Sequence, residues 1–199
     1  RADLKSDVLK DLEKQKQVLN SYRGNPAISE QVLDDVVARL DHCFTTLSGL
    51  PGKAGQSLTE NDWLMSVRSR AVIPGGTCEF DLPAYFAWQN KNTAIRHADL
   101  QTWTSTVKPL AQSIGILLNM LRDSGTPQKV VAPVGQFQQP LPQGRTFQLL
   151  RLRIDPSLDL IPEISGNRLL VSVRLMRLAE DTRLHPSNSD TLFELTLCS

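Results

Sequence analysis

The stretch LRDSGTPQKVVAPVGQFQQPLPQGRTFQLLRLRI, residues 121–154, marks where the character of the sequence changes. Residues 126–144 contain four prolines and many glutamines, a composition that predicts a linker or a loosely paired hairpin rather than a helix. In residues 147–154, leucines alternate with Arg151 and Arg153, as in a strand with one buried face. The stretch therefore predicts a protein in which helices come first and strands follow.

Before this stretch, apolar residues recur with the period of a helix. Thr59 and Asp62 resemble a capping box that opens one of the helices, and Pro109 interrupts another because proline has no amide donor. Two antiparallel helices joined by a short turn open the chain. We expect helical segments at residues 2–22, 29–48, 59–70, 82–88 and 94–123, the last of them broken or kinked at Pro109.

After it, residues 168–178 and 191–198 also alternate in the manner of strands. We therefore expect the α+β class, with an N-terminal α-helical bundle domain over residues 1–125 and a small antiparallel β-sheet domain over residues 126–199. Because the chain begins with Arg1 directly on an amphipathic pattern, we expect the helical domain to be incomplete at its N-terminus.

The composition excludes several classes of protein. The formal net charge is +1, from 22 basic and 21 acidic residues, so nothing global favours nucleic acid or an anionic membrane as a partner. No apolar run approaches the roughly 18 to 20 residues of a membrane helix, and we expect neither a membrane segment nor a signal peptide. Cys43, Cys78 and Cys198 form no CxxC pair, and no histidine near them has the spacing of a zinc site, which predicts a reduced cytoplasmic protein without a metal or other cofactor.

The sequence carries no local signature of catalysis. It lacks a GxSxG elbow, a P-loop and an HExxH motif, and the pair Gly75 and Gly76 predicts a tight turn rather than a phosphate site. His42 and Cys43 are adjacent on a predicted helix, where neighbouring residues do not share a face. We therefore expect no catalytic residues and a protein that is not an enzyme.

Arginine is the more informative residue type. Residues 145–177 hold six arginines and three acidic residues, and arginines that alternate along strands could form a cationic shelf on one sheet face. Such a shelf suits a carboxylate-bearing peptide, because guanidinium binds carboxylate through two parallel hydrogen bonds. A solvated outer face that protects an edge strand is the alternative, and so is a module that binds single-stranded nucleic acid or serves as another adaptor.

The segment VRSRAVIPGGTCEFDLP, residues 67–83, followed by Trp88, resembles the R-x-R-x-x-I-P-G-G-x-C-x-F-D-L-P signature of the ZapD family. The charged opening at residues 1–15 is also similar to that family. Further matches lie at residues 149–152, 162–166, 173–176 and 193–195, so the resemblance runs through nearly the whole chain in order.

The resemblance implies a helical domain followed by a strand domain in a homodimer. It implies a cytoplasmic protein at midcell that binds the C-terminal tail of the tubulin-like protein FtsZ, bundles its protofilaments and stabilises the Z ring. Two functional arginines of the family match Arg1 and Arg174, whereas another falls on Leu170, with Arg168 nearby as a substitute. The candidate residues for binding the tail are Arg1, Arg68, Arg70, Arg151, Arg168 and Arg174.

Overall fold

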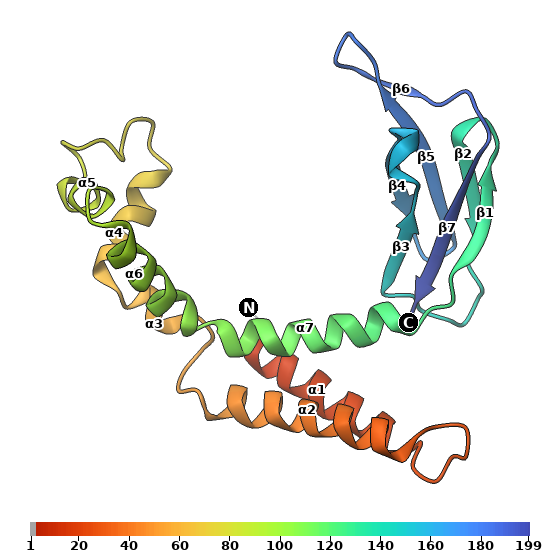
Figure 1. Cartoon of the computed structure of the whole chain (residues 1–199), viewed down its shortest axis with the longest axis horizontal. Helices are drawn as coiled ribbons and strands as arrows, with labels where there is room; N and C mark the ends of the chain where they lie inside the picture. The colour runs from red at the N-terminus through yellow and green to blue at the C-terminus, as the bar shows by residue number, and fades with distance from the viewer. Residues whose placement is uncertain (1–2) are drawn as a thin grey trace. The chain divides into compact units, whose positions relative to one another are not determined.

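The structure is a computed structural model that describes residues 3–199. The chain divides into two compact units, Arg1–Leu117 and Leu118–Ser199, the first helical and the second built from two antiparallel sheets (Figure 1). The predicted α+β class, with helices before strands, is confirmed. The helices are α1 (Leu4–Asn20), α2 (Glu30–Gly49), α3 (Gln56–Thr59), α4 (Asp62–Ala71), α5 (Pro83–Gln89), α6 (Thr93–Ser105) and α7 (Lys108–Asp123).

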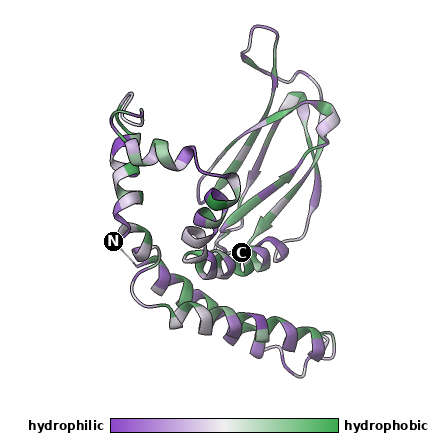
Figure 2. Ribbon diagram, turned by 60° about the vertical axis from the view of Figure 1, so that its left-hand side comes forward, coloured by the Kyte–Doolittle hydropathy of each residue, from purple (hydrophilic) through white to green (hydrophobic). Residues whose placement is uncertain are grey.

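Helices α1 and α2 pack against each other through narrow apolar stripes (Figure 2, where apolar residues are green). Leu12 of α1 and Leu40 of α2 are each 1% exposed. The side chain of Ser29 accepts a hydrogen bond from the Val32 amide and caps α2, which satisfies one of the free donors of the first turn. Lys16 and Asp41 form an ion pair of 2.8 Å between the two helices. The predicted helix pair is therefore confirmed.

The start of α4 differs from the one that the sequence predicts, whereas the predicted break of the last helical stretch is present. Asn61, not Thr59, caps α4, because its side chain accepts from the Leu64 amide while the Thr59 hydroxyl donates to a carbonyl of α3. The predicted break near Pro109 is confirmed, because α6 ends at Ser105, whose carbonyl would need the amide donor that Pro109 lacks. Pro109 itself lies in the first turn of α7, where a missing donor costs nothing.

Two three-residue 3₁₀ segments, Pro133–Gly135 and Pro156–Leu158, interrupt the strands of the second unit. The first sheet has the order β1-β7-β3, and the second has the order β2-β5-β4 with β6 also paired to β5. The strands are β1 (Gln128–Ala132), β2 (Gln136–Pro140), β3 (Leu149–Arg153), β4 (Ile161–Gly166), β5 (Leu170–Leu178), β6 (Leu184–Pro186) and β7 (Thr191–Cys198).

The proline-rich residues 126–144 are neither a linker nor a hairpin. They form β1, which pairs with β7 of the first sheet, and β2, which pairs with β5 of the second. Proline is tolerated here because both are edge strands, where one row of amides has no ladder partner, and because Pro140 ends its strand. The segment therefore crosses from one sheet to the other and ties them together.

The core of this unit lies between the inner faces of the two sheets. Val173 and Leu175 of β5 are fully buried, and Phe193 and Leu195 of β7 are each 2% exposed. The ring of Phe137 meets that of Phe193 edge to face, with the ring centroids 5.4 Å apart. The predicted alternation of these strands is confirmed, and it places their polar residues on the outer faces.

The end of α7 is fastened to the sheets. The carbonyl oxygen of Arg122 accepts hydrogen bonds from the Arg151 guanidinium (2.6 Å) and the Cys198 thiol (3.7 Å). A β-carbon added at Gly125 would come within 2.5 Å of the Leu197 carbonyl oxygen, so only glycine fits this crossing. The last turns of α7 thus belong with the second unit, while the predicted division into domains at residue 125 stays a prediction.

Gly125→Ala should lower the free energy of unfolding by about 1–3 kcal/mol, because the added methyl overlaps β7. Gly115→Ala is the matched control: it lies inside α7 with no atom near the new methyl, so alanine should be neutral or stabilise the helix by up to about 1 kcal/mol. Urea unfolding followed by circular dichroism measures both. Equal stability of the two variants would contradict the close approach at Gly125.

Candidate functional site

The arginines of the β unit do not share one face. Arg151 and Arg153 lie on the outer face of the first sheet, opposite Thr196 and Glu194 of β7. Arg174 lies on the outer face of the second sheet. Because the two inner faces pack against each other, the outer faces point in opposite directions. The expected single cationic shelf is therefore wrong.

Arg174 occupies the centre of the second sheet. Arg174 pairs with Gln136 of β2 on one side and with Glu163 of β4 on the other, so the three residues form one row across the sheet. Paired residues point to the same face, and the next row along the strands points to the opposite face. The acidic atom nearest to Arg174 is the Glu163 carboxylate at 3.8 Å, and 54% of the Arg174 side chain is exposed. An exposed pair at this distance is weak, so the guanidinium is accessible to another carboxylate.

An apolar strip adjoins Arg174 on the same outer face. Met176 pairs with Ile161 of β4, and Leu178 pairs with Leu184 of β6. Ile161, Leu178 and Leu184 are 43%, 53% and 41% exposed, although an outer sheet face is ordinarily polar. A cation beside exposed apolar side chains can bind a peptide that carries a carboxylate and an apolar residue close together.

Arg168 and Leu170 flank this face at its far end. Residues 167–169 form the turn between β4 and β5, in which the Asn167 side chain accepts from the amides of Leu169 and Leu170. Arg168 is exposed in this turn rather than within the strand that the sequence predicts. Leu170 pairs with Pro140 on the face that carries Arg174, so a leucine stands where the resemblance places an arginine.

Arg151 has a structural contact in the fold. Its guanidinium donates to the Arg122 carbonyl at the end of α7, and arginine or lysine near a helix C-terminus complements the helix dipole. Arg153 faces Glu194 at 3.5 Å. On this sheet, the two arginines already have partners within the unit.

The remaining candidates lie elsewhere. Arg68 and Arg70 are exposed in the last turn of α4, in the helical unit. Arg1 lies outside the described residues. The structure therefore places Arg174 at the centre of the second sheet and Arg168 in the turn that precedes β5, and it puts Arg174 and Arg151 on opposite outer faces of the β unit.

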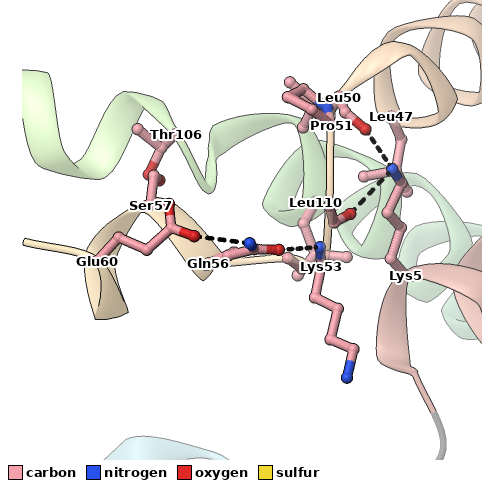
Figure 3. Close-up of a pocket in the computed structure, with 13 residues that line it drawn as sticks. Lys5, Leu47, Leu50, Pro51, Lys53, Gln56, Ser57, Glu60, Thr106 and Leu110 are labelled. Carbon is pink, nitrogen blue, oxygen red and sulfur yellow. Dashed lines mark hydrogen bonds between the residues drawn. The ribbon is translucent and has the colours of Figure 1, made fainter.

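A pocket of about 330 Å³ in the helical unit is built around Lys5 (Figure 3). The Lys5 ammonium donates to the carbonyls of Leu50 and Gly52, and the Gln56 side chain bridges the Lys53 amide and Glu60. These contacts hold the loop after α2 in place. The side chains of Lys5 and Gln56 thus bind the protein's own backbone.

A second pocket, lined by Arg177, His185 and the loop after β6, contains a histidine beside an acid. The His185 ring lies 3.3 Å from the Asp181 carboxylate. A hydrogen bond from the Arg183 amide, with a smaller contribution from His185, lowers the pKa of the Asp181 carboxyl. His185 and Asp181 lie in an exposed hairpin. Within residues 3–199, no serine, threonine or cysteine side chain is hydrogen-bonded to the His185 ring.

Residues 3–199 contain no group of three or more histidines, cysteines or acids placed to hold a metal ion. Within the same residues, no helix combines the length and the apolar character that crossing a membrane requires. Sequence reasoning missed Glu163 and the apolar strip, because Pro162 obscures the alternation of β4 and because pairing between strands is a tertiary property.

Comparisons with known proteins give one result. Residues 1–174 match the ZapD family, which is described as a cell division protein. The whole chain is 46% identical to cell division protein ZapD of Janthinobacterium sp. (strain Marseille) over 199 residues, and it covers 79% of that protein. It is 48% identical to the ZapD proteins of Ralstonia pickettii (strain 12J) and Ralstonia nicotianae (strain ATCC BAA-1114 / GMI1000), again covering 79% of each. The resemblance found in the sequence is confirmed.

Proposed function

The chain belongs to the ZapD family of cell division proteins, and from that membership we propose that it binds the C-terminal tail of FtsZ and cross-links FtsZ protofilaments in the Z ring. It acts in the cytoplasm at midcell as a homodimeric binding protein without catalytic activity.

The observation that supports this function most directly is the surface around Arg174. An accessible guanidinium, held loosely by Glu163, lies one ladder row from the exposed side chain of Ile161 and two rows from those of Leu178 and Leu184. A flexible peptide tail can place a carboxylate on Arg174 and an apolar side chain on the strip in one extended stretch, because successive ladder rows on this face lie about 7 Å apart.

Arg168 extends the same surface at the β4–β5 turn, and we assign it a secondary contact with the tail. Arg68 and Arg70 lie in the other unit, and Arg151 is engaged with α7, so these arginines are weaker candidates. The tail site of the proposal is therefore centred on Arg174.

Cross-linking requires two tail sites in one particle. A homodimer presents the Arg174 surface twice, and two tethered sites can hold tails from two different filaments. The second binding event becomes intramolecular once the first has formed, so a weak individual contact is sufficient to hold filaments together.

The protein should pellet with FtsZ polymers and should fail to pellet with polymers of FtsZ that lacks its C-terminal tail. Sedimentation with GTP-assembled FtsZ measures this, and light scattering or electron microscopy of the same samples reports bundling. The protein alone in the supernatant is the control. Equal pelleting with tail-less polymers would refute binding through the tail.

Arg174→Glu should weaken binding of a fluorescent tail peptide by about tenfold or more, because it replaces a charge-assisted contact with repulsion. Glu163→Gln should strengthen binding by up to about fivefold, because it removes the carboxylate that competes for Arg174. Both effects should grow at low salt. Fluorescence anisotropy gives the dissociation constants.

Arg153→Glu is the matched control for charge, since Arg153 is also an exposed, ion-paired strand arginine but lies on the opposite outer face. If Arg153→Glu weakens the peptide as much as Arg174→Glu, the effect is one of net charge and the site is misplaced.

A further inference from the structure

The inner face of the second sheet changes character where β5 runs into the hairpin with β6, whose loop projects past the other strands of the unit (Figure 1). Val173 and Leu175 of β5 point into the core, and Arg177 is the next residue on the same side of the strand. Arg177 pairs with His185 of β6, so the two side chains point to the same face. This face therefore passes from an apolar core to an arginine and a histidine.

A pocket of about 430 Å³ lies at this end of the sheet. Arg177, His185, Ser187, Asn188 and Ser189 supply its polar groups, and among the described residues no aspartate or glutamate lines it. Its volume lies within the range of small-molecule sites, about 300–1,000 Å³. A guanidinium, an imidazole, two hydroxyls and an amide are all able to donate hydrogen bonds, so the lining has the composition of an anion site.

Ser187 is the buried member of this lining. It is only 4% exposed, and its amide donates to the Leu175 carbonyl at 2.8 Å. A β-carbon added at Gly135 would come within 2.8 Å of the Ser187 carbonyl oxygen, so the turn after β1 approaches Ser187 closely as well. Contacts with β5 and with this turn therefore fix the position of Ser187.

The two serines of the pocket retain a free hydroxyl hydrogen. Their Oγ atoms lie 3.2 Å apart, and Ser187 Oγ also accepts from the Ser189 amide. Each hydroxyl has one hydrogen to donate, and a bond between two hydroxyls uses only one of the two hydrogens. One hydroxyl hydrogen therefore remains for a ligand in the pocket.

The Arg177 guanidinium also has donors to spare. One terminal nitrogen donates to the Leu158 carbonyl at 3.4 Å, whereas a guanidinium carries five N–H donors. Among the ion pairs of residues 3–199, none involves Arg177. Arginine binds phosphate through two parallel hydrogen bonds, and an arginine without an acidic partner has both available.

The acids of this region have partners of their own. The Asp181 carboxylate accepts from the Arg183 amide and lies 3.3 Å from Nε2 of His185. The Asp190 carboxylate accepts from the Val134 amide. Because Asp181 partly offsets the charge that His185 gains on protonation, Arg177 is the main source of positive charge in the pocket.

We propose that this pocket binds a phosphate group, either as the free ion or as part of a small ester such as a nucleotide. Two phosphate oxygens accept from Arg177, and the free hydroxyl hydrogen of the serine pair serves a third. The inference goes beyond the proposed function. Arg177 lies on the opposite face of β5 from Arg174, and the site requires no FtsZ.

Nuclear magnetic resonance titration of the isotope-labelled chain tests the site, with the backbone amides of Ser187, Asn188 and Ser189 as reporters. Inorganic phosphate and AMP should both shift these amides, while adenosine and acetate should leave them unchanged because neither carries a phosphate. Tighter binding of AMP identifies an ester as the ligand, and equal binding identifies free phosphate. Adenosine binding as tightly as AMP, or acetate as tightly as phosphate, overturns the inference.

Arg177→Gln should weaken phosphate binding by about tenfold, because it removes the charged contact that forms two bonds. Arg183→Gln is the matched control, since Arg183 is an exposed arginine of the same hairpin that does not line the pocket, and it should change binding by less than about twofold. Circular dichroism checks that both variants fold.

Two further results would refute the phosphate site. One is that the reporter amides do not respond to tens of millimolar phosphate or AMP. The other is that Arg177→Gln and Arg183→Gln weaken binding equally, since the attraction would then be one of general charge. All these measurements are made without FtsZ, so the failure of the phosphate site leaves tail binding standing, and the failure of tail binding leaves the phosphate site standing.

Discussion

The packing of β5 against β7 is the contact on which the organisation of the β unit depends. Val173 and Leu175 meet Phe193 and Leu195 in a core from which water is excluded, and β5 and β7 are the central strands of their sheets. Once these inner faces are buried, the residues that alternate with the core positions, Arg174 of β5 and Glu194 of β7 among them, must point outward. The core therefore decides which arginines share a surface and which lie on opposite sides.

The two outer faces carry different arginines as a result. On the first sheet, Arg151 is bound to the end of α7, and Arg153 forms an exposed ion pair with Glu194. On the second sheet, Arg174 forms an exposed ion pair with Glu163, and exposed apolar side chains lie on the same face. An exposed cation near uncovered apolar area favours binding of a further chain, and the match of Arg174 to a functional arginine of the family is the reason for centring the tail site on the second sheet.

The helical unit also leaves large apolar side chains in solvent, in the loop between α4 and α5. The family signature at residues 67–83 coincides with the exposed loop, not with a catalytic or metal site. Its glycines and turns hold Phe80 in solvent, while Leu82 anchors the loop beneath. An apolar surface that an ordered loop holds in solvent is typical of an interaction site.

The sequence by itself determined the class of the fold, the alternating apolar positions of β5 and β7, the helix pair α1–α2 and the family. These features depend on local periodicity and on short motifs, both of which can be read along the chain. The sequence could not show that residues 126–144 supply strands to two different sheets, that Arg151 and Arg174 face opposite ways, or that Glu163 lies beside Arg174. Only the tertiary structure decided those points. Strand pairing joins residues far apart in sequence, and a strand pattern specifies that one face is buried without specifying which neighbour buries it.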